Sequence, residues 1–340
     1  MRAALIGLPF SGKSTIFKAL TGVETGKKEE TVGTIKVPDE RVDKLADLYN
    51  PKKKTYAEFI LSDFTVPVSK SSIINPKVKN MIQKTDLLIF MIRNFDSIMT
   101  AAPVDAVSEY SALRDEMILS DSITVEKRLD MEQKEKKNPP ELETLKKLHA
   151  ILEEGKMPLE HDFTNNDAVK VSNYNFLTMK KKIVLVNQSE GEFNIPESIK
   201  NEIEKDRLDA FCVSAALELE LSELSFEEQC EFFEGYGLHE TSRERFIKNA
   251  YKALGLISFF TAGSDEVKAW PIKRGICAAD AAGKIHSDIQ RGFIRAETVH
   301  FDDFIQYRSE AECKKAALYR LNGKEYQVKD GDIINFRFNV

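Results

Sequence analysis

The sequence predicts an α/β protein: a first domain with a parallel-type sheet, followed by a smaller β-rich domain. A phosphate-binding motif lies at residues 7–14, directly after a short apolar run. Further short apolar runs alternate with helical stretches, which is typical of a parallel sheet. From residue 256 the runs are short and separated by glycines. With 340 residues, 42% of them hydrophobic, the chain is long enough for two or three domains.

The first elements form the context that a phosphate-binding loop requires. Residues 3–6 predict a buried strand, and residues 7–14 match G-x-x-x-x-G-K-[ST] at every specified position. A helix follows, ended by Gly22. In this geometry backbone amides face the phosphates, Lys13 reaches the outer phosphates and Ser14 ligates Mg²⁺. The residues expected at the nucleotide are Phe10, Ser11, Gly12, Lys13, Ser14 and Thr15.

Five more segments predict strands, and the last four suit a sheet covered on both faces. They are residues 31–37, 56–62, 86–92, 182–187 and 209–213.

A charge-rich segment, residues 106–179, interrupts this pattern. Apolar residues recur at three- and four-residue steps on both sides of Pro139 and Pro140. Their positions are Val125, Leu129, Leu142, Leu145 and Leu152, with His149 in the same series. The spacing predicts an antiparallel, coiled helical hairpin, although a solvated helical excursion without a partner explains the charge equally well.

The C-terminal region, residues 256–340, predicts a compact β-rich domain. Five cations there are candidates for a basic face beside Trp270 or Phe293: Lys268, Lys273, Arg274, Arg291 and Arg295. Because residues 257–340 hold 13 basic and 12 acidic side chains, scattered solvated charges around core aromatics are the favoured alternative. We expect ordinary hydrogen bonds, not metal ligation, for His286 and His300.

The composition argues against several classes of protein. The net charge of −6 gives no global case for nucleic acid or an anionic membrane. The four cysteines show no C-x-x-C spacing, and no signal peptide or long apolar span is evident. We expect a soluble, cytoplasmic protein in a reducing compartment.

Several long blocks resemble the YchF group of Obg-like ATPases, and the similarity runs essentially end to end. The clearest are residues 259–263, 267–270, 281–288, 291–297 and 329–340. The resemblance implies a G domain at 1–105 and 180–255, a coiled-coil insertion at 106–179 and a ubiquitin-like TGS domain at 256–340. It also implies ATP preferred over GTP, Mg²⁺, and association with ribosomes or RNA; we expect a monomer.

The base-recognition motif agrees with that preference. Residues 187–190 read Asn-Gln-Ser-Glu where a GTPase has N-K-x-D. Asn187 can bond the base edge, Gln188 replaces the lysine, and the longer Glu190 does not chelate guanine in the same way. Asn187 alone would suit a strand-end turn. Ser214, Ala215 and Ala216 resemble the family's last nucleotide-contacting loop.

The switch regions depart from the family. Asp63, implied as the water-mediated Mg²⁺ ligand, is present, but Val66 replaces the glycine of D-x-x-G and Pro67 follows. The metal-binding threonine of the family's first switch has no clear counterpart among Thr25, Thr31 and Thr34.

The family's loop histidine is missing from residues 94–103, so no catalytic residue is assigned. Phe10 replaces an asparagine, which argues against stimulation by potassium. Two functions remain: a slow ATPase switch acting as a regulator on the ribosome or RNA, or a hydrolysis-deficient nucleotide-binding adaptor.

Overall fold

The computed structural model describes residues 1–26, 29–64, 74–96, 103–135, 139–192, 194–225, 228–229 and 241–339. It consists of two compact units, Met1–Ile35 with Ile60–Arg245, and Lys36–Phe59 with Phe246–Val340. The boundaries of the three domains expected from the sequence rest on changes in composition along the chain, whereas the two units are defined by their compactness. The three-domain division remains a prediction.

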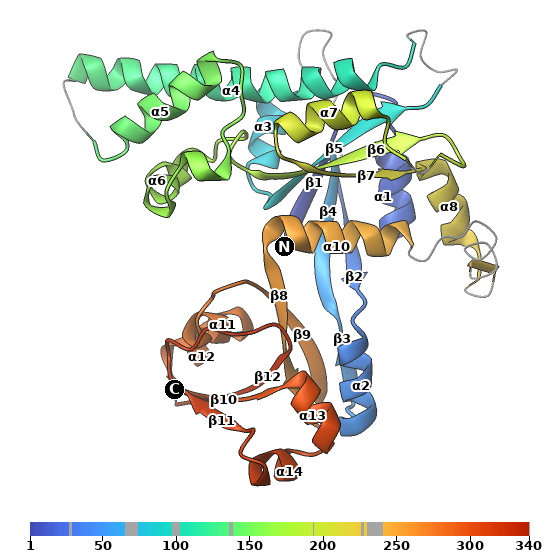
Figure 1. The fold of residues 1–340 in the computed structure, drawn as a ribbon, viewed down its shortest axis with the longest axis vertical. Helices are drawn as coiled ribbons and strands as arrows, with labels where there is room; N and C mark the ends of the chain where they lie inside the picture. Colours follow the sequence, from blue (N-terminus) through green and yellow to red (C-terminus); the bar gives the residue numbers. More distant parts are fainter. Residues whose placement is uncertain are drawn as a thin grey trace. The chain divides into compact units, whose positions relative to one another are not determined.

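A six-stranded sheet forms the centre of the first unit, in the order β2-β4-β1-β5-β6-β7 (Figure 1). The strands are β1 (Arg2–Ile6), β2 (Glu30–Val37), β4 (Ala57–Phe64), β5 (Leu87–Asn94), β6 (Lys181–Gln188) and β7 (Asp209–Val213). β1 pairs in parallel with β4 and β5, as β6 does with β5 and β7. The sequence predicted all six strands and the parallel character of the sheet.

Helices cover both faces of this sheet. α3 (Pro76–Ile82), α4 (Ala106–Glu135) and α7 (Glu197–Lys205) pack on one face through a cluster that includes Phe90 and Tyr110. α1 (Lys13–Thr21) and α8 (Ala215–Glu223) lie together on the other face (Figure 1). Because both faces are buried, strands such as β5 are apolar without alternation.

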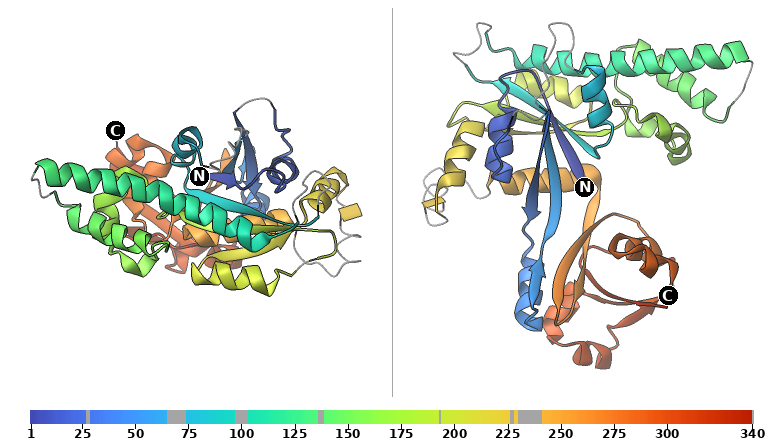
Figure 2. Two further views of the ribbon diagram at one scale, coloured as in Figure 1. Left: turned by 90° about the horizontal axis from the view of Figure 1, so that it is seen from above. Right: turned by 180° about the vertical axis from the view of Figure 1, so that it is seen from behind.

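The predicted helical hairpin is confirmed. α4 is a continuous helix that runs along the sheet and past it, where α5 (Leu142–Glu153) lies beside it (Figure 2). A separate core cluster joins them, with Val125 of α4 against Leu145, Leu148 and Leu152 of α5. η1 (Glu160–Asp162), α6 (Asn165–Val171) and η2 (Ser172–Tyr174) complete the insertion.

The second unit contains another six-stranded sheet, in the order β11-β10-β12-β8-β9-β3. Its strands are β3 (Lys53–Thr55), β8 (Leu256–Ala262), β9 (Glu266–Lys273), β10 (Phe293–His300), β11 (Arg320–Asn322) and β12 (Asp332–Phe338). β8 and β9 form an antiparallel hairpin, and β12 returns parallel to β8. This arrangement around α11 (Ala278–Ile285) is the ubiquitin-like fold that the resemblance implied.

The remaining helices of this unit surround the sheet. They are α2 (Glu40–Tyr49), α12 (Ser287–Arg291), α13 (Phe301–Tyr307) and α14 (Glu310–Lys315), while α10 (Ser242–Leu254) leads into β8. The segment 36–59 is tied to the C-terminal residues, since β3 pairs with β9 and Arg41 bonds Asp330 at 2.9 Å.

The aromatic and histidine side chains singled out in the C-terminal sequence lie in ordinary structural positions. Phe293 is buried in the core and cannot stack on a base. The Trp270 indole donates to Thr261, and the Lys268 ammonium lies 3.9 Å from the ring centroid. His286 accepts a hydrogen bond from a backbone N–H at the start of α12, and His300 does so at α13, as expected. Within the described ranges, none of the helices combines the length and apolarity needed to cross a membrane.

Candidate nucleotide-binding site

The predicted phosphate-binding loop connects β1 to α1, and its tight geometry depends on Gly12. Gly12 has a φ of 92°, in the left-handed region that favours glycine. A Cβ there would lie 2.2 Å from the Asn187 side-chain nitrogen. Phe10 has a φ of 65° and an exposed side chain, so an aromatic residue occupies a strained position in the same loop.

Lys13 lies folded over the loop. Its ammonium donates to the carbonyl oxygens of Gly7, at 2.9 Å, and Leu8, at 2.7 Å. Burial lowers the pKa of Lys13, against the opposing charges of Asp63 and Glu109. A bound phosphate carries a full negative charge, so it would bind the Lys13 ammonium more strongly than the two carbonyl oxygens, which are only partly charged.

Ser14 and Asp63 come together at the carboxyl end of β4. Ser14 Oγ donates to Asp63 Oδ2 at 2.8 Å, while Asp63 Oδ1 is buried without a hydrogen-bond partner. Burial raises the pKa of the Asp63 carboxyl. A hydroxyl and a carboxylate are the hard oxygen donors that Mg²⁺ prefers, so these residues fit a magnesium site.

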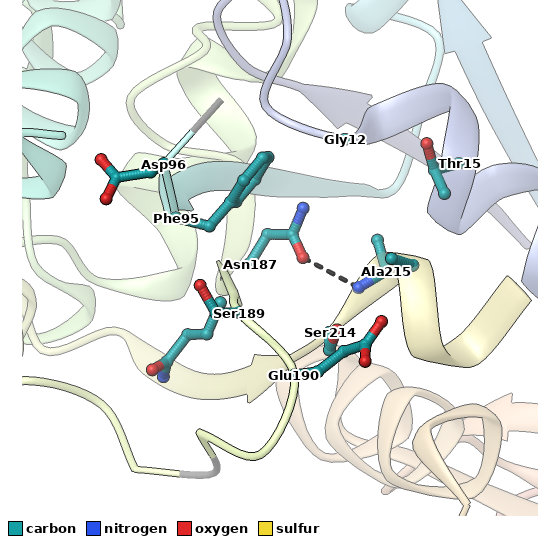
Figure 3. A pocket seen from close by; sticks show the side chains of 11 residues that line it. Gly12, Thr15, Phe95, Asp96, Asn187, Ser189, Glu190, Ser214 and Ala215 are labelled. Atoms are coloured by element: carbon teal, nitrogen blue, oxygen red, sulfur yellow. Dashed lines mark hydrogen bonds between the residues drawn. The ribbon is translucent and has the colours of Figure 1, made fainter. Parts of the chain in front are cut away.

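The Asn187 side chain links the end of β6 to the phosphate-binding loop and to the start of α8. Its Nδ2 donates to the Ser11 carbonyl oxygen at 3.0 Å, and its Oδ1 accepts from the Ala215 backbone N–H at 2.9 Å (Figure 3). Both ends of the amide therefore bond protein, and the predicted contact with a base edge stays a prediction. Ser214 caps α8, accepting from the Leu217 N–H at 3.5 Å.

A cavity of about 330 Å³ opens beside Asn187. Its lining comes from the loop, from α1 and from the ends of β5, β6 and β7: Gly12, Thr15, Phe95, Asp96, Asn187, Gln188, Ser189, Glu190, Ser214, Ala215 and Ala216. Most of the predicted nucleotide residues are thus brought together at one edge. Phe10, Ser11, Lys13, Ser14 and Asp63 are not among the lining residues; the first four belong to the phosphate-binding loop and the start of α1, and Asp63 lies near the end of β4. Gln188 is buried, and its amide donates to Asn194.

The sequence analysis did not assign Phe95, Asp96 or Ser189. Figure 3 shows the Phe95 ring directed toward Asn187, with Asp96 beside it. Phe95 and Asp96 directly follow β5, which neighbours β6. Because ligands bind outside the carboxyl ends of parallel strands, their position was the signal that would have found them.

Parts of the predicted switches lie outside the described residues. Val66 and Pro67 belong to the undescribed range 65–73, and most of the loop that lacks the family's histidine belongs to 97–102.

The P-loop, the covered parallel sheet and the cavity at its carboxyl edge define a P-loop nucleotide-binding protein. A family model, YchF-GTPase_C, described as "Protein of unknown function (DUF933)", matches residues 256–339. The chain is 37% identical to the ribosome-binding ATPase YchF of Bacillus subtilis (strain 168), covering 100% of both. It is 34% identical to the protein of that name from Escherichia coli O157:H7, over 100% of this chain and 99% of the relative. The chain belongs to the YchF family.

Solved structures agree. The Schizosaccharomyces pombe YchF GTPase superposes with a TM-score of 0.87 at 28% identity, over 99% of this chain and 97% of that one. A GTP-binding protein from Pyrococcus horikoshii OT3 gives a TM-score of 0.64 at 18% identity, covering 100% of both chains, which shows the fold alone.

Proposed function

We propose that this protein binds ATP together with Mg²⁺, hydrolyses it slowly, and acts as a nucleotide-dependent regulator on the ribosome in the cytoplasm, as a monomer. The proposal rests on one observation: the P-loop, the Ser14–Asp63 pair and the cavity lie at the same edge of the parallel sheet. Ribosome association is proposed because the bacterial relatives are named ribosome-binding ATPases.

The phosphates belong at the loop. Lys13 and the first turn of α1 supply positive charge and N–H donors, while Ser14 and Asp63 would hold Mg²⁺. The ion, when bound, would neutralise phosphate charge. Apart from Asp63, which opens the altered D-x-x-G segment, these residues lie outside the two switches, so we expect the changes there to affect ground-state binding little.

ATP is favoured over GTP by the base end of the site. Selection of guanine by N-K-x-D depends on an aspartate that accepts from two N–H groups. Here the corresponding residue is Glu190, one methylene longer, and Phe95 offers an aromatic face. The relatives' names differ, since the Schizosaccharomyces protein is titled a GTPase. Comparison of ATP and GTP binding to this chain therefore tests the proposed preference directly.

Slow hydrolysis follows from the missing positioning groups. A group that orients the attacking water contributes mainly to the transition state, so its loss lowers the rate more than the affinity. The alternative, a nucleotide-binding adaptor without hydrolysis, is favoured by the same substitutions.

Single-turnover hydrolysis of ATP and GTP, with and without ribosomes, tests the proposal. Lys13→Ala should abolish nucleotide binding and turnover. Lys18→Ala, in the same helix but paired with Glu24 in solvent, should leave both unchanged. Tight ATP binding without cleavage, even on ribosomes, would support the adaptor. Equal behaviour of the two variants would refute the assigned phosphate site.

A further inference from the structure

Glu109 and Arg93 form a buried ion pair next to the cavity. Arg93 donates twice to one carboxylate: its backbone N–H to Glu109 Oε2 at 3.0 Å, and its Nε to Oε1 at 3.0 Å. The two residues are 5% and 8% exposed. A carboxylate that holds both the main chain and the side chain of one residue fixes that residue's position and orientation.

The position that is fixed is the end of β5. Arg93 is the penultimate residue of the strand and lies opposite Asn187 in the register of β5 with β6. Phe95, two residues further on, and Asp96 line the cavity. The chain that presents these two side chains therefore leaves the sheet from a clamped point.

Glu109, which accepts both hydrogen bonds from Arg93, lies on a helix that is itself held in the core. Glu109 lies in the first turn of α4, and its neighbour Tyr110 is buried in the core, with its ring 6.2 Å from that of Phe90. The Tyr110 hydroxyl donates to Asp206 at 2.5 Å. Helix α4 cannot follow a movement of the β5 end without disturbing this packing.

We propose that Glu109 is a positioning residue that sets the affinity for the base and ribose of ATP by holding Phe95 and Asp96 at the cavity. The inference rests on the proposed ATP site and deepens it. Glu109→Gln removes one acceptor and directs an amide N–H₂ at one of the two Arg93 donors. One buried donor then loses its partner, and the hold of Glu109 on the β5 end is weakened.

The phosphate end should respond in the opposite direction. Burial lowers the pKa of Lys13, and the negative charges of Asp63 and Glu109 act against that shift. Removing that charge leaves the field at the phosphate loop more positive, which favours an anion. A positioning role thus predicts weaker ATP binding with unchanged or tighter binding of a phosphate chain that has no nucleoside.

Asp121 offers a matched control. It is a buried carboxylate on the same helix and also accepts from one backbone N–H and one side chain, both of Thr178, at 2.7 and 2.8 Å. It lies about 18 Å further along α4 at 1.5 Å per residue. Asp121→Asn reproduces the loss of a buried carboxylate without touching the β5 end.

The experiment is calorimetric titration of Mg·ATP and Mg·tripolyphosphate into the full-length wild type, Glu109→Gln and Asp121→Asn. We expect Glu109→Gln to weaken ATP about tenfold without weakening tripolyphosphate, and Asp121→Asn to change neither. Equal losses for both ligands, or the same ATP loss in Asp121→Asn, would overturn the positioning role. A wild type that binds no ATP would reject the proposed function itself.

A double-mutant cycle gives an independent test. Because Glu109 acts by holding Phe95 and Asp96, Glu109→Gln should cost little further ATP affinity in a background that already carries Phe95→Ala and Asp96→Ala. Additive losses would contradict the inference. If Glu109→Gln does not fold, Glu109→Asp keeps the charge but is too short to reach both donors, and it should lose ATP affinity in the same selective way.

Discussion

Ser14 Oγ donates a 2.8 Å hydrogen bond to Asp63 Oδ2, joining the first turn of α1 to the end of β4. Residues 49 positions apart thus converge beside Lys13. The pair brings together the two oxygen donors assigned to Mg²⁺, so little rearrangement is needed when the metal and the phosphates arrive.

The first prediction concerns pH. Burial raises the pKa of Asp63 above its ordinary 3.8, so protons compete with Mg²⁺ at higher pH than for an exposed aspartate. Mg²⁺-dependent ATP affinity should fall as the pH is lowered through that raised pKa. Binding titrations across acidic pH measure this, and Asp63→Asn should weaken the metal dependence and remove the part of the pH dependence that comes from Asp63.

The same shift has a consequence for stability. The folded carboxyl binds its proton more tightly than the unfolded one, so Asp63 lowers the free energy of unfolding as the pH rises from 3.8 through the folded pKa. Without nucleotide at neutral pH, Asp63→Asn should raise the free energy of unfolding. A lower value would show that the Ser14 contact outweighs the desolvation of the charge.

The second prediction separates backbone strain from steric overlap. Gly22→Ala, at a φ of 72° with nothing within 4 Å, should cost about 1 kcal/mol of unfolding free energy. Gly12→Ala has the same strain and a Cβ 2.2 Å from Asn187, so it should cost about 1–3 kcal/mol more. It should also weaken ATP binding. Denaturant titration and calorimetry check both, and equal costs would refute the tight approach to Asn187.

The third prediction concerns Phe10. Asparagine tolerates a left-handed backbone better than an aromatic residue, so Phe10→Asn should stabilise the protein by about 1 kcal/mol. Replacing sodium by potassium should leave ATP hydrolysis by the wild type unchanged. Thermal denaturation and hydrolysis assays in the two salts test these points. Potassium stimulation of the wild type would contradict the role given to Phe10.

The fourth prediction uses a buried amine remote from the loop. Burial lowers the pKa of Lys182 to about 7, with Asp121 and Asp206 opposing, and its ammonium nitrogen lies 2.5 Å from the Thr178 carbonyl oxygen. In the unfolded chain the Lys182 amine keeps its proton up to about pH 10.5, whereas in the folded protein it loses the proton above about pH 7. The free energy of unfolding should therefore rise with pH between about 7 and 10.5, by at most about 1.4 kcal/mol per pH unit.

Lys182→Met should remove that slope, while Lys181→Met, at the exposed neighbouring position, should keep it. Denaturant unfolding at several pH values provides the measurement. An unchanged slope in Lys182→Met would show that the amine is not neutral in the folded protein above about pH 7.

Local patterns predicted the parts of this protein that local chemistry determines. The phosphate loop, Gly22 as the end of α1, and the leucines of α5 follow from spacing alone. The contacts of Asn187 did not, because Ser11 and Ala215 reach it only after β6 has taken its place in the sheet. Strand β3 was missed for a similar reason, since Lys53–Thr55 has no apolar pattern and is a strand only by pairing with β9.

The most direct test of the account is equilibrium binding of ATP and GTP to the full-length protein with Mg²⁺. The account predicts saturable ATP binding, weaker GTP binding, and loss of both in Lys13→Ala. A wild-type protein that remains nucleotide-free at millimolar ATP would contradict it.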